Sequence, residues 1–126
     1  AQTTRELPAL YSIEMKALSE KIWMITPSGR LDAAQSKHLA SVLSGQLEMQ
    51  HRWLIVNMAA VETISSTGLK MLVNIWQRAR DLKGDLVLTG VLPDVREVLQ
   101  MIGLDLVFKI TNTTEQARAY FTSKSK

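Results

Sequence analysis

Cysteine is absent from the 126 residues of this chain, and only two histidines are present. Without cysteine there are no disulfides and no thiolate ligands for a metal ion, and the redox compartment is left open. His38 and His51 have no cluster of carboxylates around them, so no metal site is predicted. We interpret both histidines as surface or partly buried side chains near the ends of a helix, and we expect no bound cofactor.

Long hydrophobic runs are absent as well. No apolar run approaches the ~20 residues that a helix needs to cross a bilayer, and no signal-peptide pattern opens the chain. We therefore expect a soluble, cytoplasmic domain without membrane insertion. The chain begins at Ala1 rather than methionine, which is typical of a trimmed chain or of a piece of a longer protein.

The sequence has no large excess of charge of one sign. It contains 15 basic and 12 acidic residues, which gives a net charge of +3, and part of this excess lies in the tail at residues 123–126. Elsewhere the basic residues are interleaved with acidic ones and form no basic stripe. Direct binding of nucleic acid is therefore not expected.

The motifs of common catalytic sites are also missing. The sequence has no Gly-x-x-x-x-Gly-Lys phosphate loop and no Gly-x-Gly-x-x-Gly dinucleotide fingerprint. Residues 64–68, Ile-Ser-Ser-Thr-Gly, lack the leading glycine of a Gly-x-Ser-x-Gly nucleophile elbow. Glu62 is the one carboxylate in this loop, which is too few for a pair of acid–base groups. We predict no catalytic residues and no enzymatic activity.

What the chain does contain is the composition of a globular protein. Hydrophobic residues make up 46% of it and charged residues 21%. A chain of this length can close a hydrophobic core without disulfides. We predict one domain over residues 1–126, with flexible segments at residues 1–8 and 123–126.

The spacing of hydrophobic residues predicts an N-terminal hairpin. Tyr11, Ile13 and Met15 alternate with polar residues, which is typical of a strand with one exposed face. Residues 22–26 form a more apolar strand, which is expected to end at the Pro-Ser-Gly segment 27–29. Together they predict an antiparallel pair with the first strand at the edge of the sheet.

After this hairpin, helices and strands alternate. A helix is predicted from Ala33 with Asp32 as its N-cap. The helix that follows the hydroxyl residues 65–67 is predicted to end near Lys83 and Gly84, where glycine supplies a left-handed residue. Strands are expected at residues 53–58, 86–89 and 106–110, and further helices at 93–102 and from 113. The order β-β-α-β-α-β-α-β-α predicts an α/β fold: a mostly parallel sheet with an antiparallel N-terminal edge strand, flanked by about four helices.

Three hydroxyl residues, Ser65, Ser66 and Thr67, lie between a predicted strand and a predicted helix, in the loop 61–69. Backbone N–H groups at a helix start have no partner within the helix, and the helix dipole adds about half a positive charge there. Such a start can hold an anion, including a phosphate bonded to one of the hydroxyls. Serine and threonine are also ordinary helix caps, so the cluster alone does not establish a functional site.

Three segments, taken together and in this order, resemble the STAS domain, the fold of bacterial anti-sigma factor antagonists. The first is residues 28–34, Ser-Gly-Arg-Leu-Asp-Ala-Ala, and the second is residues 64–69, Ile-Ser-Ser-Thr-Gly-Leu. The third is residues 92–99, Leu-Pro-Asp-Val-Arg-Glu-Val-Leu, followed by Gly-Leu at 103–104. The resemblance covers roughly residues 9–122.

This resemblance implies a phosphorylation switch. In the family, a serine is phosphorylated by a partner that is both a serine-protein kinase and an anti-sigma factor. The unmodified antagonist binds that partner and frees the sigma factor, and the phosphorylated form lets go. Carried over by position, the acceptor is Ser66, with its hydroxyl facing solvent at the helix cap. Ser65 stands where the family usually has aspartate.

The resemblance also implies a surface that binds the partner, in which Gly68 leaves the backbone accessible. Its expected residues are Arg30, Asp32, Glu62, Ile64, Ser65, Ser66, Thr67, Gly68 and Leu69. We expect a monomer or a weak dimer. A second reading stays open: a STAS module without this switch, such as a stressosome-like scaffold or a subunit of a lipid-transport complex.

Overall fold

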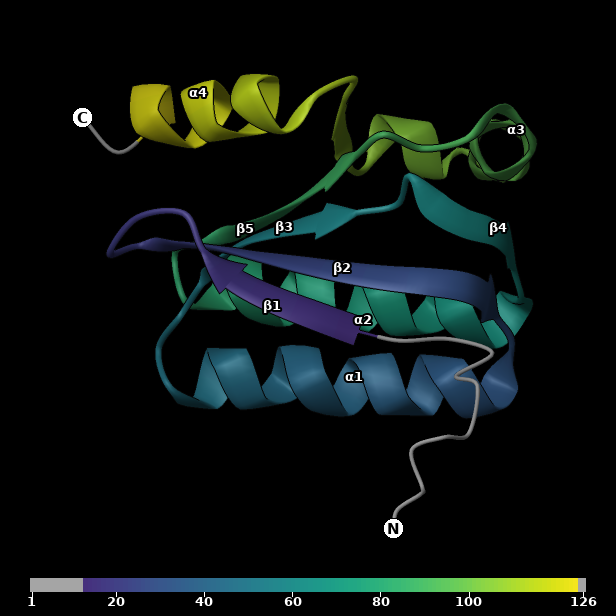
Figure 1. The fold of residues 1–126 in the computed structure, drawn as a ribbon, viewed down its shortest axis with the longest axis horizontal. Coiled ribbons are helices and arrows are strands. Elements are labelled where there is room, and N and C mark those ends of the chain that lie inside the picture. Colours follow the sequence, from purple (N-terminus) through teal and green to yellow (C-terminus); the bar gives the residue numbers. More distant parts are fainter. Residues whose placement is uncertain (1–12, 125–126) are drawn as a thin grey trace, which may run out of the picture.

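The computed structural model describes residues 13–124, which form one mixed sheet between two layers of helices (Figure 1). The elements in chain order are β1 (Ile13–Ala17), β2 (Ile22–Leu31), α1 (Ala33–Glu48), β3 (Trp53–Asn57), β4 (Ala60–Ile64), α2 (Ser66–Asp81), β5 (Asp85–Thr89), α3 (Pro93–Met101), the short 3-10 helix η2 (Leu104–Leu106), β6 (Lys109–Thr111) and α4 (Thr114–Lys124). Among the described residues, no helix is both long enough and apolar enough to span a membrane.

The sheet has the order β1-β2-β3-β5-β6, and β4 pairs with β2 beyond the end of β3. Within residues 13–124, β1 and β2 form the one antiparallel pair and the other pairs are parallel. This confirms the predicted fold class, with an antiparallel N-terminal edge strand. Tyr11, which was predicted to belong to this edge strand, lies outside the described residues.

Alternate side chains of the strands divide the core between the two faces of the sheet. On β3, Leu54 and Val56 belong to the larger core, to which α1, α2 and α3 also contribute. Ile55, between them, points to the other face, where it packs with Ala117 and Phe121 of α4. Figure 1 shows α1 and α2 below the sheet and α4 above it. The period of two along the strand thus determines which helix each residue contacts.

β2 is longer than predicted, because the segment 27–29 continues the strand instead of ending it. Strand β3 pairs with β2 only as far as Ile25, and β4 pairs with it from Ser28 onward. Pro27, which has no N–H to donate, falls in the gap between these two ladders. Gly29 adopts the left-handed φ of 92° that the irregular pairing with β4 requires.

Strand β4 was not predicted at all, because its residues were taken as a loop. Val61 is completely buried, but Glu62 and Thr63 are both exposed, so the simple alternation of a strand is broken. The register explains this: Gly29 pairs with Val61 and Arg30 pairs with Thr63. Glu62 is therefore an extra residue in a β-bulge.

Three further boundaries differ from the prediction. Where a strand was expected at residues 106–110, the chain forms η2 first and only then the short strand β6. The left-handed residue after α2 is Lys83, with φ of 70°, not Gly84. Gly84 is required for another reason, because a Cβ there would lie 2.0 Å from the carbonyl oxygen of Arg52. Residues 123 and 124, predicted to be flexible, belong to α4, whereas 1–8 and 125–126 lie outside the described residues.

Candidate functional site

The start of α2 follows directly on strand β4, and Ser65 is its N-cap. The backbone of Ser65 is extended (φ −84°, ψ 168°), and its Oγ accepts a hydrogen bond from the N–H of Gly68 at 3.1 Å. The N–H of Leu69 donates to the carbonyl oxygen of Ser65 at 3.0 Å, which begins the helical ladder. The prediction placed Ser66 at the cap, and this was wrong by one residue.

Ser66 and Thr67 are the first two residues of the helix, and both are exposed. Neither hydroxyl hydrogen-bonds to any residue in the described part of the chain. The hydroxyl of Ser65, in contrast, is half-buried and used as the cap. Of the three neighbouring hydroxyls, two are therefore available to another molecule.

The carbonyl oxygen of Leu31, the last residue of β2, joins the starts of two helices. It accepts the N–H of Ser65 at 2.8 Å and the Oγ–H of Ser36, a buried residue of α1, at 3.4 Å. One residue later, Oδ1 of Asp32 accepts the N–H of Gln35 at 3.0 Å and caps α1, as predicted. The N-termini of α1 and α2, each with its partial positive charge, therefore lie at the same edge of the sheet.

Gly68 is buried, which corrects the expectation that it exposes backbone to a partner. A Cβ added there would lie 2.8 Å from Cγ1 of Ile64, 2.9 Å from Oγ of Ser36 and 3.3 Å from the carbonyl oxygen of Leu31. The glycine is needed because α2 starts in close contact with the end of β2 and with α1. Its role in the site is to let Ser65 reach its capping position.

The other residues of the expected partner surface surround this junction. Arg30, Asp32 and Glu62 are exposed, and Ile64 is half-buried. Leu69 is 9% exposed and belongs to the larger core. We call the exposed residues of this surface the α2 start; they are Arg30, Asp32, Glu62, Ser66 and Thr67. All the expected residues come from two adjacent strand ends and the helices that follow them.

Sequence reasoning missed three residues that shape this site. Leu31 was named only as part of the motif 28–34, and Ser36 was not considered, because a buried hydroxyl between two helices leaves no periodic signal. Lys70 was also missed, although it is exposed and lies four residues after Ser66. That spacing places the two side chains on one face of the helix, and it could have been read from the sequence.

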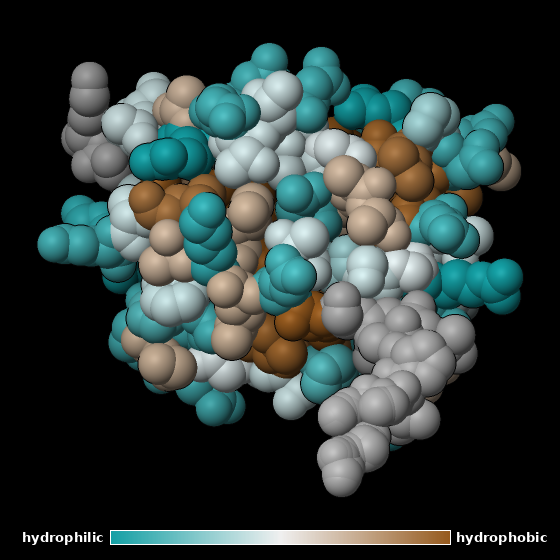
Figure 2. Space-filling model, viewed as in Figure 1, coloured by the Kyte–Doolittle hydropathy of each residue, from teal (hydrophilic) through white to brown (hydrophobic). Residues whose placement is uncertain are grey.

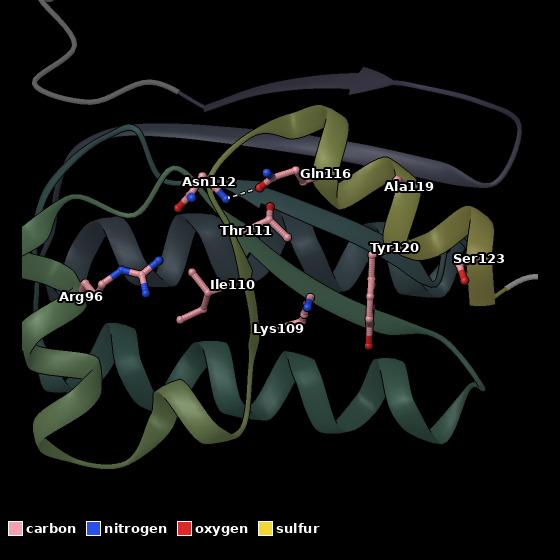
Figure 3. A pocket seen from close by; sticks show the side chains of 9 residues that line it. All are labelled: Arg96, Lys109, Ile110, Thr111, Asn112, Gln116, Ala119, Tyr120 and Ser123. Atoms are coloured by element: carbon pink, nitrogen blue, oxygen red, sulfur yellow. Dashed lines mark hydrogen bonds between the residues drawn. The ribbon is translucent and has the colours of Figure 1, made fainter.

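The described residues contain no group of three or more His, Asp or Glu side chains that could hold a metal ion. An open groove of about 650 Å³ lies across edge strand β6, as shown in Figure 3. Arg96 and Lys109 line it, with Tyr120 beneath the Lys109 ammonium at 5.3 Å from its ring centroid. It shares no lining residue with the α2 start. The chemistry that the α2 start offers is a pair of exposed hydroxyls at the positive end of a helix.

Comparison with known proteins gives one consistent result. The sequence profile described as "STAS domain" matches residues 15–117. BtrV of Bordetella bronchiseptica, named as an anti-sigma factor antagonist, is 30% identical over 93 residues, which are 74% of this chain and 80% of BtrV.

Solved structures share the fold at lower sequence identity. An anti-sigma factor antagonist of Mycobacterium paratuberculosis has a TM-score of 0.79 and 20% identity, covering 90% of this chain and 96% of that one. The antagonist SpoIIAA in its unphosphorylated form has a TM-score of 0.79 and 18% identity, covering 89% and 97%. Bacillus SpoIIAA has also been solved in its phosphorylated form, with a TM-score of 0.71 and 18% identity, covering 87% and 99%.

Proposed function

The chain belongs to the STAS domain family, and we propose that it is an anti-sigma factor antagonist switched by phosphorylation of Ser66. In the unmodified state it binds an anti-sigma factor that is also a serine-protein kinase, and so releases a sigma factor. The observation that carries this proposal is the hydroxyl of Ser66 in the first turn of α2, which is exposed and has no hydrogen bond to residues 13–124. The likeness to BtrV and to SpoIIAA, a protein known in both phosphorylation states, supports it.

A phosphate fits the first turn of α2 electrostatically. It adds a charge of about −1.5 to −2 at neutral pH, and the unpaired N–H groups and the dipole of the helix start favour that charge. Folding therefore tolerates the modification. A partner that contacts the neutral serine would have to desolvate and oppose the new charge, which weakens the complex.

The N-cap of α2, Ser65, is uncharged, and this affects the charge of the α2 start before phosphorylation. Ser65 stands where the family usually has aspartate, and its Oγ performs the capping hydrogen bond that a carboxylate would also make. Before phosphorylation, the α2 start thus carries one negative charge fewer than with aspartate. Phosphorylation is then a proportionally larger change in charge.

The presence of Ser65 in place of the usual aspartate also favours a second function, a STAS module that acts as a scaffold without a phosphorylation switch. A kinase that recognises the aspartate would not recognise Ser65. In that case the partner surface operates through binding alone, as in a stressosome-like assembly or a lipid-transport complex.

The deciding experiment mixes this chain with ATP and a candidate kinase, a purified anti-sigma factor that has a serine-protein kinase domain. The product is analysed by intact-mass measurement. We expect one phosphate on the wild type, none on Ser66→Ala and one on the matched control Thr67→Ala. Phosphate that persists on Ser66→Ala and disappears from Thr67→Ala would move the acceptor to Thr67. Stable binding with no phosphate on any variant would favour the scaffold function.

A further inference from the structure

Exposed hydrophobic residues are concentrated in one short segment. Among the described residues, six large hydrophobic side chains are exposed, and four of them lie between residues 101 and 107. These are Met101 (78% exposed), Ile102 (54%), Leu106 (88%) and Val107 (37%), which we call the α3–η2 patch. Figure 2 shows hydrophobic surface at the upper right, over the corner formed by α3 and η2. Contiguous apolar surface of this kind marks a site of interaction.

The backbone at the end of α3 keeps these side chains out of the core. Val95 and Leu99 take the buried positions of the helix, and Ile102 is already its C-cap. Gly103, with φ of 79°, turns the chain into η2. After this turn Leu106 projects into solvent, because no described element covers it.

An apolar groove connects the α3–η2 patch to helix α2. It has a volume of about 370 Å³ and lies between α2 and the segment from Ile102 to Leu104. The groove is lined by Leu69, Lys70, Val73, Asn74, Gln77, Ile102 and Leu104. Five of these seven residues belong to α2, the helix that begins with Ser66.

We propose that this groove is the second half of the partner interface, occupied by an apolar segment of the anti-sigma factor kinase that carries a carboxylate opposite Lys70. The inference rests on the proposed function and extends it from Ser66 along α2 as far as Gln77. It names the chemistry of the partner's contact: hydrophobic side chains with an adjacent acidic group.

Continuity along one helix supports this occupant. Positions 66, 70, 73, 74 and 77 fall on one face of α2, so the groove begins within about one turn of Ser66. From Leu69 to Gln77 it extends for about 12 Å along the axis. A stable interface covers about 800 Å² of each partner, far more than the few exposed residues of the α2 start. Since the centre of an interface is apolar and the α2 start is polar, the groove is the surface that can provide that centre.

The positive charge of Lys70 in the groove indicates that the partner segment carries an acidic side chain. Lys70 is the groove's only charged lining residue, and in the described part of the chain no carboxylate pairs with it. An acidic side chain on the partner would therefore meet an unpaired cation at the rim of an apolar contact. This favours a partner carboxylate over a partner cation.

Phosphorylation of Ser66 would also affect Lys70 in the groove. A phosphate on Ser66 lies four residues before Lys70, the spacing at which opposite charges attract on a helix surface. Phosphorylation thus draws the ammonium group away from the partner's carboxylate. The modified chain would oppose the partner at Ser66 and also withdraw a contact at Lys70.

The test measures affinity for the purified kinase by calorimetric titration without ATP hydrolysis. We expect the patch variant Ile102→Gln, at the one patch residue that also lines the groove, to bind at least tenfold more weakly than the wild type. Its melting temperature should be preserved, because the Ile102 side chain is 54% exposed. Met49→Gln is the matched control: this methionine is 63% exposed at the end of α1, outside the groove, and its substitution should leave affinity unchanged. Lys70→Gln should also weaken binding and should reduce the additional effect of Ser66→Asp.

The arms of this test separate the two proposals. If Ser66→Asp weakens binding but the patch variant binds like the wild type, the groove proposal is overturned and the switch remains. If neither affects binding, the proposed function itself fails. If the patch variant changes the sedimentation of the free chain instead of kinase affinity, the groove binds a second copy of this chain, which also contradicts the proposed occupant.

Discussion

Two adjacent serines at the start of α2 have different environments, which the resemblance of motifs distinguishes only by position and not by physical contacts. The Oγ of Ser65 is held by the N–H of Gly68, whereas Ser66 is exposed and unbonded within the described chain. A hydroxyl used as a cap would have to give up its hydrogen bond to react. The structure therefore provides a physical reason to prefer Ser66 over Ser65 as a phosphate acceptor.

The substitution Ser66→Asp tests the switch at this residue. A carboxylate in the first turn is compatible with the dipole, so the free energy of unfolding should change by less than about 1 kcal/mol. The kinase partner should bind more weakly, but less so than with phosphoserine, because aspartate carries a smaller charge and two oxygens rather than three. Thermal unfolding and titration of both proteins check this, and equal affinity in a well-folded variant would contradict the switch.

Gly68 offers a prediction about stability. The side chain of Gly68→Ala would press against Ile64 and Ser36, so we expect a loss of about 1–3 kcal/mol, in spite of alanine's higher helix propensity. The control is Gly45→Ala in α1, where no atom lies within 4 Å of the added Cβ. That substitution should stabilise by about 0.5–1 kcal/mol. Urea denaturation of both variants measures the difference, and similar values would argue against close packing at Gly68.

At the scale of elements, the site is a junction of strand ends and helix starts. β2 and β4 end side by side, and α1 and α2 begin there with their caps, Asp32 and Ser65. Both caps depend on the position of Leu31, which is bonded to Ser65 and Ser36. The rigidity of the α2 start therefore comes from the pairing of two strands rather than from the loop itself.

The cap of α2 can be tested alone. Ser65→Ala removes the acceptor for the N–H of Gly68 and should destabilise the protein by about 1 kcal/mol. Ser65→Asp should retain the cap and lose little stability, because aspartate accepts the same hydrogen bond. Ser66→Ala, at an exposed position without this bond, should have a much smaller effect. Equal melting temperatures for Ser65→Ala and Ser66→Ala would show that the cap is not used.

At the scale of the whole molecule, hydrophobic periodicity was sufficient to predict the order of the elements except β4 and η2, and a sheet flanked by helices. Strand β3, with three consecutive buried residues, and helix α2, with its apolar positions spaced by three and four, carry that signal clearly. Strand β4 has only one fully buried residue, Val61, and its bulge at Glu62 disrupts the alternation. A strand of this kind can be found only from its pairing with β2, which is a tertiary contact.

The same limit explains why the α3–η2 patch was not predicted. Ile102 fits the apolar spacing of α3 and was therefore assigned to a buried face, yet it is 54% exposed. Periodicity indicates which residues share a face, but not whether another element covers that face. Here no described element covers it. The residues of the α2 start were identified through the resemblance of short motifs, while the contacts of Leu31 and Ser36 required coordinates.

The bond between the N–H of Ser65 and the carbonyl oxygen of Leu31 has a consequence for local opening of the native state. It joins residues that are 34 positions apart and closes the ladder between β2 and β4 at the helix start. The α2 start can therefore be released without global unfolding only if the short β4 separates from β2. Amide exchange at Ser65 would then report the free energy of that separation, and a bound partner that slows it would have stabilised the strand end as well as the helix.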